Sequence, residues 1–176
     1  MSHTDNDLRF ASSHFIYHLR MYVETYQWLE DNPEKPDGWD TERNSILEAH
    51  LVHARVLINF FFPQSKRDDD VLVADYIHEF NSMNNVNVDF LRTQAKDIGG
   101  KLVHLTLKPK PYLMSEKEWQ ILEIVKNLVP IINSFLKNVP ESKFEEDKLT
   151  ESKEILSDLT SRLTSRPSRF SLSPST

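Results

Sequence analysis

The sequence predicts an all-α fold, an antiparallel up-and-down helical bundle of four long helices plus short helices. In four long stretches, apolar residues recur at three- and four-residue steps, which is the pattern of a helix with one buried face. Only three glycines occur among 176 residues, and so few argue against the many tight turns of a β-sandwich or barrel. Hydrophobic residues make up 39% of the chain, so a chain of this length can bury a core without disulfides or metal.

The first two long helices are predicted over residues 7–30 and about 40–62. The first has one continuous apolar stripe, formed by Leu8, Ala11, Phe15, Leu19, Tyr22, Tyr26 and Leu29. Prolines and Gly38 within residues 31–40 end it. The second has an inner stripe of Leu47, Leu51, Ala54, Ile58 and Phe61, widened by Ile46, His50, His53, Leu57 and Phe60. A face this broad predicts a central helix of the bundle.

The next segment predicts a short helix over residues 71–80, with a strand as the alternative because Val71–Val73 is β-prone. A third long helix follows, with a stripe of Val88, Leu91, Ala95, Ile98, Leu102 and Leu105, and it ends before Pro109. The Gly99–Gly100 pair inside it indicates a bend, or a place where another backbone comes close.

A capping box at Ser115–Glu118 predicts the start of the fourth long helix. Its apolar stripe is Leu122, Val125, Val129, Ile132 and Leu136. Pro130 interrupts this stretch. Because proline lacks an N–H and collides with the carbonyl four residues earlier, we expect a kink or a break near Val129.

Composition divides the chain into three parts. Residues 1–140 are expected to form the helical bundle domain. Residues 141–164 read as a charged, weakly amphipathic C-terminal helix, with seven acids and three lysines over 141–158. Residues 165–176 read as a disordered Ser/Pro/Arg tail with little to bury.

Several function classes are excluded by residues that the sequence lacks. Without cysteine there is no disulfide scaffold, thiolate metal site or cysteine nucleophile. Without glycine at fixed spacing there is no nucleotide-binding turn, and no serine-nucleophile signature occurs. No stretch has the apolar length of a membrane span, and the N-terminus lacks a signal-peptide pattern. We therefore expect a cytoplasmic protein with no cofactor and no membrane partner.

The net charge of −6 disfavours a broad RNA-binding surface, because such binding depends on Lys and Arg that neutralise phosphates. It leaves RNA possible at a small local site.

Two histidine pairs could supply metal ligands. His14 and His18 lie four residues apart on one helix, and His50 and His53 lie three apart on another. The His-Glu-x-x-His and Glu-x-x-His patterns are absent, so we assign no metal residue. The competing interpretation is that these histidines flank the core and hydrogen-bond to neighbours or water.

His104 is the candidate catalytic residue. Asp97, Lys101 and His104 share one face of the third long helix, and a histidine beside a lysine can do acid–base chemistry. The alternative is a surface pair of Asp97 with Lys101, and a histidine that closes the helix end.

Four segments carry a resemblance to known proteins: Glu48–Ile58, Phe60–Phe62, Asp68–Val71 and Lys101–Thr106. In helix order over residues 8–138, the chain resembles a group of small bacterial helical proteins, and its Lys-x-x-His segment is similar to the HEPN superfamily. That resemblance implies a helical bundle, often dimeric, and in many members a metal-independent ribonuclease of toxin–antitoxin and other defence systems.

The chain departs from the family signature, in which an arginine precedes the histidine by four to six intervening residues. The corresponding positions hold Asp97, Ile98 and Gly99. Lys101 is the only cation on the face of His104, and the neighbouring carboxylate would repel phosphate. The resemblance therefore implies a non-catalytic member.

Three functions remain open. The first is a HEPN-like bundle without nuclease activity that acts through protein–protein contact, as a homodimer. The second is a metal-independent ribonuclease using His104 with Lys101, or with an arginine from another helix such as Arg55. The third is a metal-binding bundle using His50 and His53. The run Phe60–Phe62 is a further sign of association, with burial by neighbouring helices as its alternative.

Overall fold

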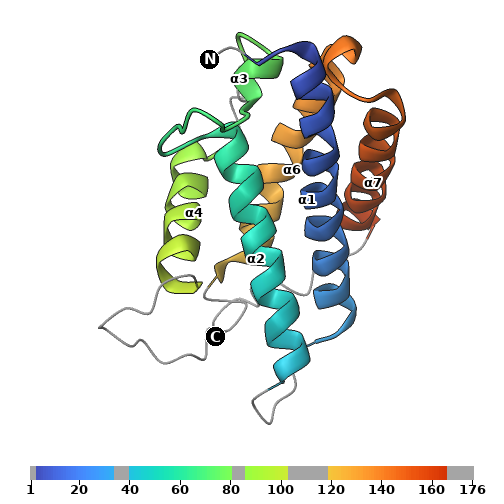
Figure 1. The fold of residues 1–176 in the computed structure, drawn as a ribbon. Coiled ribbons are helices and arrows are strands. Elements are labelled where there is room, and N and C mark those ends of the chain that lie inside the picture. Colours follow the sequence, from blue (N-terminus) through green and yellow to red (C-terminus); the bar gives the residue numbers. More distant parts are fainter. Residues whose placement is uncertain (1–2, 34–39, 81–85, 103–118, 166–176) are drawn as a thin grey trace.

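The computed structural model describes residues 3–33, 40–80, 86–102 and 119–165 of the chain, and it confirms the all-α prediction (Figure 1). Within these residues there are six α-helices, one short 3-10 helix and no strand. The elements are α1 (Asp5–Asp31), α2 (Thr41–Phe61), α3 (Val73–Tyr76), α4 (Val88–Leu102), α6 (Ile121–Asn138), η1 (Glu141–Lys143) and α7 (Glu146–Ser165).

Side-chain caps fix the starts of α1 and α2. Thr4 precedes α1, and its hydroxyl accepts the N–H of Asp7 while the Asp7 carboxylate accepts the N–H of Thr4. Asp40 precedes α2, and its carboxylate accepts the N–H of Arg43. Both caps satisfy amide groups that have no partner within the first helical turn.

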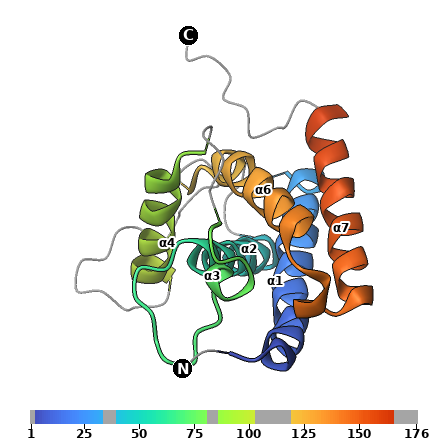
Figure 2. The ribbon, with the colours of Figure 1, turned by 90° about the horizontal axis from the view of Figure 1, so that it is seen from above.

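Helices α1 and α2 run in opposite directions along their contact. On the α1–α2 contact, His18 lies opposite His53 and Thr25 lies opposite His50, so these two helices are antiparallel. Figure 2, which looks down on the molecule, shows α2 in the middle with α4 on one side and α1 on the other.

The C-terminal helix α7 runs parallel to α1. Hydrogen bonds link Arg9 to the Ser142 carbonyl and Gln27 to Asp158. Residue numbers therefore rise in the same direction along α1 and along the segment from η1 through α7. Its buried residues Leu149, Leu156 and Leu159 belong to the same hydrophobic core as the other helices. The structure thus packs this charged segment on the bundle.

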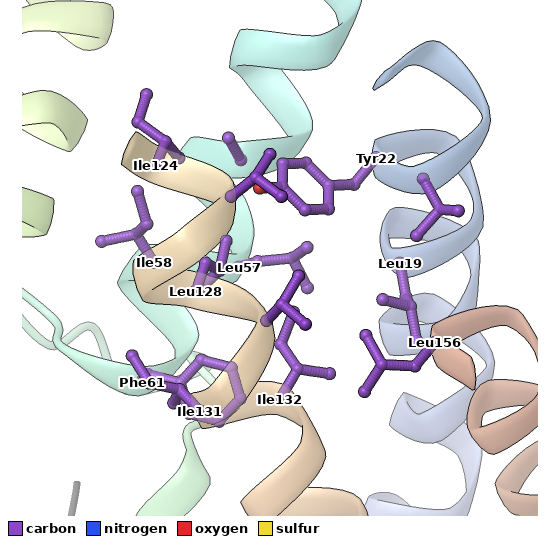
Figure 3. Packing of buried hydrophobic residues seen from close by; sticks show 14 of the residues in the cluster. Leu19, Tyr22, Leu57, Ile58, Phe61, Ile124, Leu128, Ile131, Ile132 and Leu156 are labelled. Atoms are coloured by element: carbon purple, nitrogen blue, oxygen red, sulfur yellow. The ribbon is translucent and has the colours of Figure 1, made fainter. Parts of the chain in front are cut away.

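The core lies between α1, α2 and α6, and Figure 3 shows its central residues. Leu19 and Tyr22 of α1 face Leu57 of α2 and Leu128 of α6 across it. At one end of the core, the ring of Phe135 of α6 lies within contact distance of six other aromatic rings. They come from α1, α2, the segment 76–80 and the segment between η1 and α7, and they are Phe15, Phe60, Phe61, Tyr76, Phe80 and Phe144. Aromatic side chains bury much apolar area, so this cluster stabilises the packing of the segments that contribute to it.

The cluster also shows where the Phe60–Phe62 run lies. Phe61 and Phe62 are buried, and Phe60 is half-buried against the core. Burial by neighbouring helices therefore accounts for Phe61 and Phe62, and Phe60 keeps part of its surface exposed.

The helix predicted over 71–80 is much shorter in the structure, where α3 covers only Val73–Tyr76. Contacts from distant segments hold it in place. The Tyr76 hydroxyl donates to the Leu8 carbonyl at 2.7 Å, and Lys143 Nζ donates to the Asp75 and Tyr76 carbonyls. The carbonyls at the end of α3 accept from a lysine side chain. They therefore have a hydrogen-bond donor although the helix does not continue.

Of the kink or break predicted near Val129, the break does not occur, since α6 continues without interruption from Ile121 to Asn138. Proline removes only one backbone hydrogen bond here, and the residues on both sides of it, Val129 and Ile131, are buried in the core. Tertiary packing of an apolar helix outweighs that local cost.

Other sequence predictions lie outside the described residues. These are the end of the third long helix beyond Leu102, the capping box at Ser115–Glu118 and the tail beyond 165. Among the helices that are described, none combines the length and low polarity needed to cross a bilayer.

Candidate functional site

Two histidines meet across the contact of α1 and α2. The Nδ1 atoms of His18 and His53 lie 2.8 Å apart, and the rings are inclined at 52°. A hydrogen bond between two ring nitrogens requires a proton on one and a lone pair on the other, so the two rings must be different tautomers. Burial, followed by the charges of His53 and His14, lowers the pKa of His18 to about 4, and burial lowers the pKa of His53. The pair is therefore uncharged at neutral pH.

His50 lies deeper in the same contact and has different partners. Its Nδ1 is 3.2 Å from the Tyr22 carbonyl and 3.2 Å from the Thr25 hydroxyl. Since a carbonyl only accepts, Nδ1 carries the proton. The ring stacks on that of Tyr22 with 4.7 Å between the ring centroids. Its Nε2 atom is buried and has no hydrogen-bond partner. Complete burial lowers the pKa of His50 to about 3.

These contacts bear on the proposed metal ligands. His53 hydrogen-bonds to His18, whereas His50 hydrogen-bonds to Tyr22 and Thr25. The two histidines therefore have different partners and do not face one common point. His14 is exposed, and the centroid of its ring lies 5.7 Å from that of Phe10. No group of three histidines or carboxylates that could hold a metal ion occurs in the described ranges. His18, His50 and His53 take part in the contact of α1 and α2, whereas His14 does not.

Outside these histidines, large apolar side chains are exposed along both helices. We call Phe10, Tyr17, Val52 and Val56 the α1–α2 face. Their exposed fractions are 71%, 54%, 41% and 37%, and they are the large hydrophobic residues exposed in the part of the chain that the structure describes. Tyr17 packs its ring edge-on against His53 at 5.5 Å, so this face covers the histidine pair.

A cleft of about 670 Å³ borders this face. It lies between α1 and α4 over α2, and the segment 63–72 closes one end. Its volume falls in the range of small-molecule sites. The charged side chains that line it are Arg55, Arg67, Asp69, Asp70 and Lys96, and His14 and His18 line it from α1.

The predicted catalytic pair lies at the edge of what the structure describes. Lys101 belongs to the last turn of α4, and His104 lies outside the described residues. Arg55, the cation suggested from another helix, lies beside α4: a Cβ built on Gly99 would be 3.0 Å from its Cζ. The nearest atoms to Gly99 are thus those of a side chain. Around Gly100 there is open space.

Sequence reasoning missed the α1–α2 face, although a signal for it exists. Phe10 and Tyr17 lie on the opposite side of the first helix from its core stripe, and Val52 and Val56 lie on the side of the second helix away from its inner stripe. Apolar residues on the polar side of an amphipathic helix would have indicated this surface. The pairing of His18 with His53 depends on the packing of two helices and has no such signal.

Searches against protein-family models, curated proteins and solved structures find no significant match to this chain.

Proposed function

We propose that this protein is a non-catalytic, HEPN-like helical protein of the cytoplasm that acts through protein–protein contact, as a homodimer. The observation that supports the proposal is the α1–α2 face. Four large apolar side chains from two adjacent helices are exposed there together. Apolar surface gathered on one side of a molecule is typical of a contact with another protein.

Charge indicates which partner this face binds. The chain has a formal net charge of −6, so two copies repel each other over much of their surface. The α1–α2 face is apolar, and the lowered pKa values of His18 and His53 keep the rings beneath it uncharged. A twofold contact brings the same residues together from both copies, which costs least where the surface has no charge. We therefore assign a second copy of this chain to the face.

The test is a measurement of molecular mass in solution. Sedimentation equilibrium from micromolar to millimolar concentration should give a monomer–dimer equilibrium for the wild type. Val52→Asp places a carboxylate on the face, and in a twofold contact two such charges come together. We expect this change to weaken the dimer at least about tenfold, since burying an unpaired charge costs more than 1.4 kcal/mol.

Ser157→Asp is the matched control, because Ser157 is an exposed residue of α7 and the change adds the same charge away from the face. This variant should dimerise like the wild type. Circular dichroism checks that both variants keep the helical fold. A wild type that stays monomeric throughout, or equal weakening by both substitutions, contradicts the proposal.

A metal-independent ribonuclease is the second candidate function, favoured by the position of Arg55. Its guanidinium lies against Gly99 of α4, five residues before His104 in the sequence. Cleavage of RNA needs an acid–base group and a cation that stabilises the phosphate in the transition state. His104 would be the first and Arg55 the second.

This candidate predicts cleavage of total RNA and short oligonucleotides in the presence of chelator. Activity should be lost in His104→Ala and reduced in Arg55→Gln. If the purified wild type leaves the RNA intact, this second function is ruled out and the binding function remains.

A further inference from the structure

Arg55 occupies space that a side chain on α4 would otherwise fill. A Cβ on Gly99 would lie 3.0 Å from its Cζ, 3.1 Å from Nη2 and 3.2 Å from Nε. Three atoms of the guanidinium therefore rest against the backbone of α4. The side chain is half-buried, so α2 and α4 hold it between them.

Most arginines in the described part of the chain have a partner. Carbonyl or carboxylate oxygens accept from Arg9, Arg20, Arg43 and Arg162, and Arg92 lies over the Phe62 ring. The exposed Arg67 side chain is free to bond to water. Arg55 is half-buried and makes no hydrogen bond or ion pair with the residues that the structure describes. A guanidinium has five N–H donors, and none of the described residues accepts from this one. The side chain lines a cleft, so its donors are open to water or to a ligand there.

The cleft beside Arg55 has room for a ligand, and a second cation lines it. Lys96 and Gly100 lie four residues apart on α4, so Lys96 is one helical turn from the glycines and lines the same cleft. Val56 and Phe60 of α2 add apolar lining. The cleft thus presents two cations from two helices beside an apolar wall.

The carboxylates of the cleft belong to another segment. Asp69 and Asp70 line it from the 63–72 segment, and Asp70 already accepts the N–H of Arg67 at 2.7 Å. Arg67 lines the cleft from the same segment, so this end has two carboxylates against one cation, whereas the lining from α2 and α4 has Arg55 and Lys96 and no carboxylate. An anionic group entering the cleft is therefore directed toward the end formed by α2 and α4.

We propose that this cleft binds a small phosphorylated organic molecule, with the phosphate held by Arg55 and Lys96 and the organic part against Val56 and Phe60. The planar guanidinium can donate two parallel hydrogen bonds to one phosphate, and a second cation matches its second negative charge. Gly99 is part of this site because a Cβ there would lie 3.0 Å from Cζ of Arg55 and would push the guanidinium away from α4 by a few tenths of an ångström.

Binding can be followed through backbone amide signals in NMR. The chain has only three glycines, so the amides of Gly99 and Gly100 are easy to identify, and the amide of Ser157 on α7, away from the cleft, serves as the reference. Titration with inorganic phosphate and with phenyl phosphate should shift Gly99 and Gly100 saturably and leave Ser157 in place. Phenyl phosphate should bind more tightly, because its ring can contact the apolar wall.

Two variants and one matched control test the geometry. Arg55→Gln should weaken binding of phenyl phosphate at least about tenfold, because a charged hydrogen-bond partner is lost. Gly99→Ala should also weaken it, whereas Gly100→Ala adds the same methyl group where nothing lies within 4 Å and should leave it unchanged. Both alanines favour the helix, so neither should prevent folding.

Absence of a saturable shift in the wild type, or unchanged affinity in Arg55→Gln, overturns the proposal. The titration reads ligand binding and not RNA cleavage. Because Val56 belongs both to the cleft wall and to the α1–α2 face, the titration is repeated in Val52→Asp, which weakens the dimer and leaves the lining of the cleft unchanged.

Discussion

The hydrogen bond between His18 and His53 can exist only while at least one of the two facing nitrogens lacks a proton. If both rings are protonated, both Nδ1 atoms become donors and face each other at 2.8 Å. Neither ring has a carboxylate partner that would favour the charged form among the hydrogen bonds and ion pairs of the described residues. Protonation therefore works against the α1–α2 contact.

Acid should destabilise the fold between about pH 6.5 and pH 4. Above pH 6.5 these histidines are neutral in both folded and unfolded chains, so they contribute no pH dependence. Below it, the unfolded chain takes up protons that the folded chain refuses until pH falls through the lowered pKa, about 4 for His18 and about 3 for His50. Each such histidine lowers the free energy of unfolding by at most about 1.4 kcal/mol per pH unit.

Urea unfolding at pH 7.5 and pH 5 measures this loss. His18→Gln should lose less stability between the two pH values than the wild type does, because glutamine does not titrate and its amide can still face His53. His53→Gln should behave in the same way. An identical loss in the wild type and both variants would show that the pair is not responsible.

At the scale of elements, α7 makes two kinds of contact with the bundle. Polar contacts run along its exposed edge, as in the Gln27–Asp158 hydrogen bond of 2.6 Å and the ion pair of Arg162 with Asp31. Its apolar contacts are buried leucines. Exposed polar pairs contribute little to stability, whereas a buried leucine contributes several times as much. The apolar contacts therefore hold α7 in place.

Leu159→Ala should lower the free energy of unfolding by about 2–5 kcal/mol, since this side chain is fully buried and its loss leaves a cavity. Gln27→Ala removes a polar contact to the same helix and should change stability by about 0.5 kcal/mol or less. Urea unfolding followed by circular dichroism compares the two. Similar losses in both variants would mean that α7 is held by its polar edge.

At the scale of the whole molecule, aromatic residues far apart in the sequence meet around Phe135. Its neighbours come from α1, α2, α3 and the segment between η1 and α7. Dense packing of this kind couples the elements, so the molecule is expected to unfold as one unit. The same packing leaves the large apolar side chains of the α1–α2 face outside the core.

The sequence by itself predicts the all-α class and the positions of the long helices. Both follow from local rules: the period of apolar residues, the caps and the position of proline. The stripes from Leu8 to Leu29 and from Leu47 to Phe61 are the buried faces of α1 and α2. The candidate site was predictable only in part: Arg55, His14, His18 and the Gly99–Gly100 pair were singled out, but Lys96 was not, and no local pattern places them around one cleft.

Tertiary structure decided the remainder. It carries α6 through Pro130, limits α3 to four residues, pairs His18 with His53 and places Arg55 against Gly99. Each of these depends on which helix faces are in contact and at what register. The apolar period specifies which face of a helix is buried, but the partner of that face is set by the packing of all helices together, and no local pattern records it.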